Sequence, residues 1–265
     1  MHSPLFDLPS LWLVQDLMIP VGIILCGVLV ARRAEREHQH ASQMLKLVVV
    51  SIIAGYLGGH ILYIFTDLPH FMENPLDILL FWTGGGVFFG GVIGVTLAFF
   101  FSIRVMQLPF CKTGDIMVPY FVLIHAIGRL HCFVGGCCFG KPTNLPLAVI
   151  YPANYLAAQS HFEEGLIDKG VASLPIHPAQ LYEAGALLLL FLFLLWLQQE
   201  KSYHGQIIVA WFFLYPALRF GLEAFRGDKY RGVYILSISQ YISIALLLLA
   251  TFFYLQLRKK RLSAH

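Results

Sequence analysis

Three stretches of the 265-residue sequence place ionisable side chains inside otherwise apolar segments, and the first holds His125, Arg129 and His131. His125 and Arg129 are spaced i, i+4 and share a helix face. If such a segment crosses a membrane, each ionisable group costs at least about 2.5 to 3.5 kcal/mol and needs a partner or a purpose. The planar fork of the Arg129 guanidinium suits a phosphate group. We therefore expect Arg129 to bind an anionic headgroup; the alternative is a pairing with Glu183 or Glu223 that holds helices together.

The second stretch contains Arg219, Glu223 and Arg226. Their i, i+4 and i, i+7 spacing lines them along one helical stripe. Arg226 then falls near the end of its apolar segment. It can extend along the helix toward lipid phosphate at the surface, which is common for long cations, or it can turn inward to a bound headgroup. We expect the inward arrangement, with Glu223 and Arg226 in the chemistry and Arg219 in substrate binding.

The third stretch begins an apolar segment with the polar residues His177, Gln180, Tyr182 and Glu183. The proline after His177 fits the first turn of a helix. We expect all four side chains to contribute to substrate binding. Hydrogen bonding between helices is an equally weighted explanation.

Glycines are concentrated in two groups, Gly84 to Gly86 and then Gly90, Gly91 and Gly94. Small residues allow helices to cross closely. Three consecutive glycines also favour a loop buried in protein at membrane depth, and a helix that starts after it would point its free N–H groups at an anion. Both arrangements stay open, and we expect Gly90 and Gly91 to contact substrate.

Cys132, Cys137 and Cys138 lie beside His131. Their spacing differs from the paired ligands of zinc sites, and the vicinal pair is awkward for an ordinary disulfide. Packing as small apolar residues is the leading interpretation, followed by a functional thiol. We expect no metal site and no cofactor.

The composition places these residues in an integral membrane protein. Hydrophobic residues make up 58% of the chain and charged residues 12%, whereas a soluble domain has about 25% charged residues. The mean hydropathy is +0.71. The net charge of +3 is too small and too dispersed to indicate nucleic-acid binding. We expect one transmembrane domain over residues 1–265.

Apolar runs of a length that spans a bilayer predict an all-α fold of about seven transmembrane helices. Most of the 18 Lys and Arg residues fall on one side of such a topology. The positive-inside rule then puts the N-terminus outside and the C-terminus in the cytoplasm. The loop 139–176 is long enough to form a folded external cap between spans four and five. The expected spans are Leu11–Ala31, Leu45–Phe65, Gly84–Val105, Ile116–Gly136, Leu181–Leu197, Gln206–Phe225 and Tyr234–Leu257.

Several blocks resemble, in order and spacing, those of the prolipoprotein diacylglyceryl transferases. They are residues 58–63, 71–76, 82–94, 128–130 and 177–183, with Arg219, Glu223 and Arg226. The resemblance implies seven spans in the bacterial cytoplasmic (inner) membrane. It also implies transfer of diacylglycerol from phosphatidylglycerol to the lipobox cysteine thiol of a prolipoprotein, with release of glycerol phosphate. In that family the arginine that matches Arg129 binds the phospholipid, and the one that matches Arg226 is essential.

The chain departs from the family pattern at three positions. Phe89 stands where the family has a histidine before two glycines, and Cys132 and Cys137 replace an asparagine and a glutamate. Imidazole is the usual general base near neutral pH, so we expect His125 or His131 to take that role.

Three other functions stay open on the sequence. One is a same-fold transferase with another thiol or lipid acceptor, the second is a non-catalytic phospholipid-binding membrane protein, and the third is a thiol oxidoreductase built on the cysteines.

Overall fold

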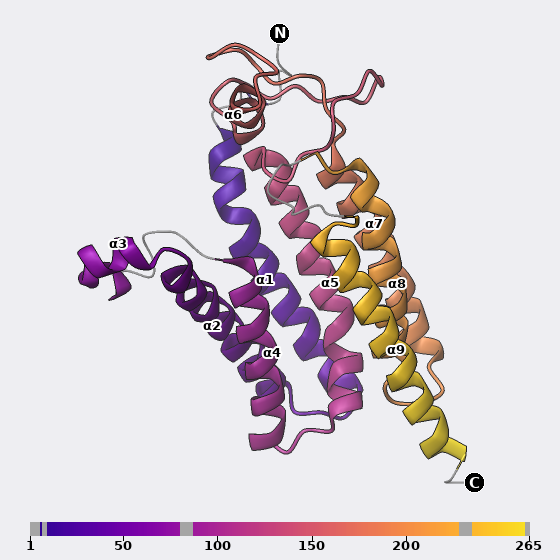
Figure 1. The fold of residues 1–265 in the computed structure, drawn as a ribbon. Helices are drawn as coiled ribbons and strands as arrows, with labels where there is room; N and C mark the ends of the chain where they lie inside the picture. The colour runs from indigo at the N-terminus through magenta and orange to yellow at the C-terminus, as the bar shows by residue number, and fades with distance from the viewer. Residues whose placement is uncertain (1–5, 7–9, 80–86, 228–234, 263–265) are drawn as a thin grey trace. The chain divides into compact units, whose positions relative to one another are not determined.

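The structure, a computed structural model, describes residues 6, 10–79, 87–227 and 235–262, and helices dominate it (Figure 1). Within these residues there is no named β-strand, only three isolated β-bridges. The elements are α1 (Ser10–Arg36), α2 (Ala41–Thr66), α3 (Leu68–Glu73), the 3-10 helix η2 (Pro75–Leu79), α4 (Phe88–Val105), α5 (Phe110–Gly135), α6 (Leu156–Glu163), α7 (Ala179–Glu200), α8 (Gln206–Leu222), the 3-10 helix η3 (Glu223–Phe225) and α9 (Ile238–Leu262).

Six of the described helices are long and apolar enough to cross a membrane, and α4 adds a shorter apolar helix over Gly90–Val105. The prediction of an all-α integral membrane protein with about seven spans is therefore confirmed. The predicted starts at Gly84 and Tyr234 lie outside the described residues, as does the triple glycine Gly84 to Gly86. The orientation of the chain across the membrane stays a prediction.

The chain divides into two compact units, Gly27–Thr113 and a larger one formed by Met1–Cys26 with Gly114–His265. The expectation of one transmembrane domain stays a prediction. In the first unit α2 packs against α4 through glycines. A Cβ added at Gly90 would collide with the carbonyl oxygen of Gly58, and one added at Gly94 would collide with that of Ala54. Close helix crossing thus accounts for these glycines.

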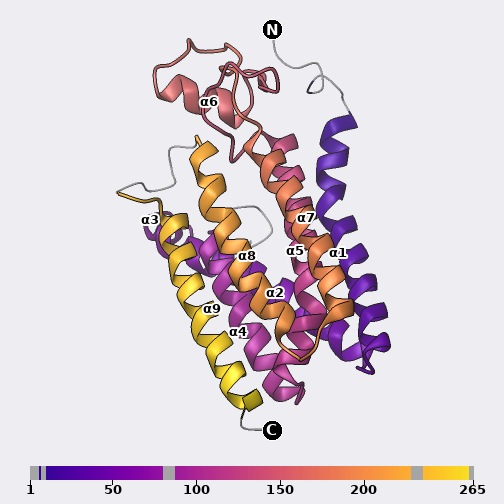
Figure 2. The ribbon, with the colours of Figure 1, turned by 90° about the vertical axis from the view of Figure 1, so that its right-hand side faces the viewer.

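The larger unit contains most of α5 together with α7, α8 and α9 (Figure 2). Its core contains apolar side chains from three of these helices: Val122 and Ala126 of α5, Leu187, Leu190 and Leu194 of α7, and Ile207 of α8. Since the opposite faces of the helices carry exposed leucines and phenylalanines, their surface suits lipid. The core holds the helices that carry the ionisable residues.

Helix α5 begins at Phe110, before the predicted start at Ile116, and it includes the buried aspartate Asp115. Asp115 is fully buried, and its carboxylate accepts hydrogen bonds from the N–H groups of Gly205, Ile207 and Ile208 at 2.8, 3.0 and 3.3 Å. These are free donors at the start of α8. The side chain of Gln198 donates to the Asp115 carbonyl oxygen at 2.7 Å. Asp115 therefore caps α8 from a neighbouring helix.

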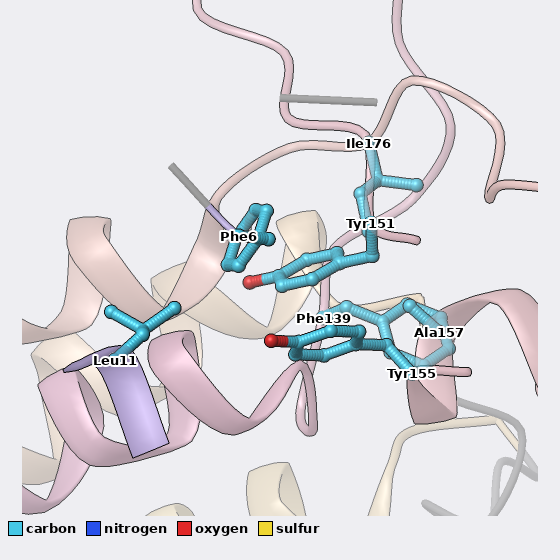
Figure 3. Packing of buried hydrophobic residues seen from close by; sticks show 7 residues of the cluster. All are labelled: Phe6, Leu11, Phe139, Tyr151, Tyr155, Ala157 and Ile176. Carbon is cyan, nitrogen blue, oxygen red and sulfur yellow. The ribbon is translucent and has the colours of Figure 1, made fainter. Parts of the chain in front are cut away.

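The segment 139–176, which was predicted to be an external cap, has a defined structure, and its place outside the membrane stays a prediction. It contains α6, and its aromatic side chains pack together with residues from the N-terminal part of the chain (Figure 3). The rings of Phe6 and Tyr151 lie 4.5 Å apart, and those of Tyr151 and Tyr155 lie 5.6 Å apart. The Tyr151 hydroxyl donates to the Phe133 carbonyl oxygen at 2.8 Å. This hydrogen bond fixes the cap to the end of α5.

Candidate active site

Arg129 of α5 forms an ion pair with Glu183 of α7. The Arg129 Nε and Glu183 Oε1 atoms are 3.1 Å apart, without the alignment of a hydrogen bond. Arg129 Nη2 lies 3.3 Å from His125 Nε2. The same His125 Nε2 atom lies 3.8 Å from Glu183 Oε1. The pairing with Glu183, considered as an alternative on the sequence, is therefore present.

A second ion pair lies at the end of α8. Arg219 Nη2 is 2.7 Å from Glu223 Oε2 and also donates to the Ser239 hydroxyl of α9 at 3.0 Å. Tyr215 lies one turn before Arg219, and its ring is 5.5 Å from that of His125. Tyr215 interacts electrostatically with Glu183, Arg129 and Arg219. The two ion pairs thus meet around Tyr215 and His125.

Arg226 is placed by main-chain pairing rather than by a helix. It forms an antiparallel bridge with Gly140 of the cap segment. The Lys141 N–H donates to the Phe225 carbonyl oxygen at 2.9 Å, and the Gly140 N–H donates to the His177 carbonyl oxygen at 3.1 Å. A Cβ at Gly140 would collide with the His177 carbonyl oxygen, so glycine permits this approach. The end of α8, the cap segment and the start of α7 meet here.

The polar residues at the start of α7 have two kinds of partner. The His177 Nδ1 and Tyr182 hydroxyl oxygen atoms are 3.3 Å apart, and both rings pack edge-on against Phe225. The buried Gln180 side chain donates to the Cys137 carbonyl oxygen at 2.7 Å. These contacts hold the end of α5 and the end of α8 against α7.

The charges of this cluster favour an anion. Arg129, Arg219 and Arg226 exceed Glu183 and Glu223 by one positive charge. All five side chains are buried or half-buried, where a charge interacts more strongly than in water. A guanidinium accepts phosphate with two parallel hydrogen bonds. The arrangement can bind a phosphate group and stabilise negative charge that develops on it.

His131, Gly90 and Gly91 were also predicted as site residues. His131 follows Arg129 by two positions, so it projects from a different face of α5. Gly90 and Gly91 belong to the other compact unit, where they pack against α2. Phe89 lies in α4. Their predicted roles stay predictions.

The three cysteines come together at the end of α5. The Sγ atoms of Cys132, Cys137 and Cys138 all lie within 4.8 Å of one another, and the thiols are free. Hydrogen bonds from the other two thiols lower the pKa of Cys138, and the cations Arg226 and Arg129 act in the same direction.

The sequence reasoning missed Tyr215, Tyr151 and Asp115. Tyr215 was within reach, because it continues the i, i+4 stripe of Arg219 and Glu223 toward the N-terminus. Tyr151 lies in a loop and Asp115 at a helix end, so no periodicity marks either of them.

Comparison with known proteins identifies the family of the chain. The sequence model of the family described as prolipoprotein diacylglyceryl transferase matches residues 15–256. A phosphatidylglycerol–prolipoprotein diacylglyceryl transferase of Clostridium tetani is 30% identical over 235 residues, which cover 89% of this chain and 89% of the relative. The protein of that name from Bordetella bronchiseptica is 32% identical over 247 residues, which cover 90% and 88% of the two chains. The chain belongs to the prolipoprotein diacylglyceryl transferase family.

Proposed function

We propose that this protein transfers the diacylglyceryl group of phosphatidylglycerol to the lipobox cysteine thiol of prolipoproteins, in the cytoplasmic membrane of a bacterium. The observation that carries the proposal is the cluster of Arg129, Glu183, Arg219, Glu223 and Arg226 at the ends of three membrane-spanning helices. The names of its relatives give the same donor and acceptor. Membrane lipids and a signal peptide are the partners.

The donor's phosphate is bound by the arginines. Arg129 is held from one side by Glu183 and His125, which fixes the guanidinium plane before the lipid arrives. Arg226 is held by its main-chain bridge to Gly140. A preorganised cation stabilises the developing charge without having to reorient, and this is often the largest catalytic contribution.

In the proposed reaction, the acceptor sulfur forms a bond to carbon 3 of the diacylated glycerol. The bond between this carbon and the phosphate oxygen breaks, and its electron pair leaves with glycerol phosphate. The thiol proton goes to a base, because the thiolate is the nucleophile. His125 is our candidate for the base, since it lies beside Arg129 and within 3.8 Å of Glu183.

Six of the other predicted residues receive supporting roles in this proposal. Glu183 and Glu223 orient the arginines, and Arg219 ties Glu223 to α9 through Ser239. Gln180 positions the end of α5. His177 and Tyr182 support Phe225, the neighbour of Arg226.

A direct assay tests the function and the role of Arg129 separately. Purified protein is incubated with phosphatidylglycerol labelled in its acyl chains and a peptide that contains a lipobox cysteine. We expect labelled peptide and equimolar glycerol phosphate from the unmodified protein and from Arg32→Ala, which removes an exposed arginine of α1. In Arg129→Ala the rate of labelled-peptide formation should fall by at least about 100-fold, as expected when a hydrogen-bond donor that stabilises the charge of the transition state is removed.

The outcomes that contradict the proposal differ for its two parts. Phospholipid binding without glycerol phosphate release by the unmodified protein would contradict the transferase and favour a lipid-binding protein. Transfer to a lipid or a small thiol but never to the peptide would contradict the acceptor. Unchanged turnover in a folded Arg129→Ala protein would contradict the role of that arginine.

A further inference from the structure

The transferase proposal makes no use of the three thiols at the end of α5. Cys132 lies in the last turn of the helix, and Cys137 and Cys138 follow it. Their sulfur atoms all lie within 4.8 Å of one another. All three residues are half-buried. An ion from solvent can therefore reach a group that is still largely shielded.

The backbone brings the thiols together by reversing direction directly after the helix. Gly136 has φ of +67° and Cys138 has φ of +56°, both in the left-handed region. The Cys137 N–H donates to the Cys132 carbonyl oxygen at 3.2 Å. Left-handed backbone is uncommon for a residue other than glycine. The buried Gln180 side chain holds the Cys137 carbonyl oxygen from α7. The turn is thus fixed by contacts from outside it.

We propose that Cys132, Cys137 and Cys138 bind one thiophilic metal ion, Zn²⁺ being the ion that the site takes. A Zn–S bond of about 2.3 Å places the sulfur atoms of one ion about 3.8 to 4.0 Å apart. The Sγ atoms of Cys132, Cys137 and Cys138 lie no farther than 4.8 Å from one another, so rotation of these side chains would bring the sulfur atoms to the spacing that zinc needs. Thiolate ligands favour Zn²⁺ and Cu⁺ over Mg²⁺ and Ca²⁺, which prefer oxygen.

The surrounding charge fits such a site. Three thiolates with Zn²⁺ carry one net negative charge. Arg129 lies three residues before Cys132 in α5, so a cation shares the helix face of the cluster. In the described part of the chain, the group consists of these three thiols. The fourth position of a tetrahedral ion stays open to water or to a thiol, as in zinc sites with three protein ligands.

Metal titration of the whole protein tests the site without relying on activity. The protein is purified in detergent through a tag without histidines and kept reduced with a phosphine, and five free thiols are counted first. Zn²⁺ affinity is measured against a chromophoric chelator, and Cd²⁺ is added separately to observe sulfur-to-metal absorption. The variants are Cys132→Ser and Cys138→Ser, and Cys111→Ser is the matched control from outside the cluster.

We expect one Zn²⁺ per chain in the unmodified protein and in Cys111→Ser, with Cd²⁺–thiolate absorption in both. Since changing an outer partner of a metal ligand already costs about 10- to 100-fold in affinity, the loss of a ligand itself should weaken binding at least about 100-fold. Equal thermal unfolding of the three variants shows that they are folded. Failure of the unmodified protein to bind stoichiometrically, or equal binding by all variants, would overturn the proposal while leaving the transferase assay unaffected.

Discussion

Replacing Asp115 with alanine tests whether the first part of α5 supports α8. The Asp115 carboxylate accepts three backbone hydrogen bonds from the first turn of α8, and its side chain is fully buried. A buried donor left without an acceptor costs about 1 to 3 kcal/mol. Loss of an N-cap costs about 0.5 to 2 kcal/mol. Because the freed donors are partly rehydrated, we expect the free energy of unfolding to fall by about 3 kcal/mol in total.

For a chain of this size, each kcal/mol lowers the unfolding temperature by about 2 to 4 °C, so the expected shift is about 6 to 12 °C. The measurement is thermal unfolding of purified protein in detergent, and it is monitored through the exposure of buried thiols. Asp16→Ala serves as the control, because it removes an exposed carboxylate from α1. Asp115→Asn keeps one carbonyl acceptor, so its unfolding temperature should lie between those of Asp115→Ala and Asp16→Ala. Equal unfolding temperatures for Asp115→Ala and Asp16→Ala would refute the capping role.

Two further predictions concern other parts of the chain. Gly58→Ala should destabilise the packing of α2 on α4 by about 1 to 3 kcal/mol, because its Cβ would collide with the Gly90 carbonyl oxygen. Gly185→Ala is the control, since a Cβ there meets nothing within 4 Å. The unfolding temperatures of the two variants test the prediction. Burial lowers the pKa of His161 below its ordinary value of 6.5, and its Nδ1 accepts a hydrogen bond from the Leu174 N–H at 3.2 Å. The neutral ring is therefore the one that the fold stabilises, and this stability is present above about pH 6.5 and lost as the pH falls below it. Amide hydrogen exchange in the cap, corrected for intrinsic rates, should become faster from pH 7.5 to about 5.5 in the unmodified protein, and a profile identical to that of His161→Gln would contradict this.

The sequence predicted the spans because apolar length is a local property. For Arg129 it predicted an anionic headgroup, with a carboxylate partner as the alternative, and it did not decide between Glu183 and Glu223 as that partner. That choice depends on how α5, α7 and α8 are rotated about their axes. Side-chain packing between helices determines this rotation, and no pattern within one helix reports it.

The cysteines and glycines show the same limit. Cys132, Cys137 and Cys138 lack the ligand spacing of a zinc site, and left-handed backbone at Gly136 and Cys138 is what brings their sulfur atoms together. Such a turn is set by contacts from other segments. Gly90 and Gly91 were expected at a substrate, and in the structure they lie against α2. The sequence allowed both arrangements, because small residues suit each of them.

The bridge between Gly140 and Arg226 has a consequence for how the protein is made. The thiols at the end of α5 leave the ribosome long before the segment that carries Arg226. Roughly ninety residues separate Cys137 from Gly227, which at about 5 to 20 residues per second takes about 5 to 18 s. During that time the cap has no bridge partner on the α8 side. The thiols are then accessible to oxidants and metal ions, and a nascent chain arrested before Arg226 would react with thiol reagents faster than the finished protein.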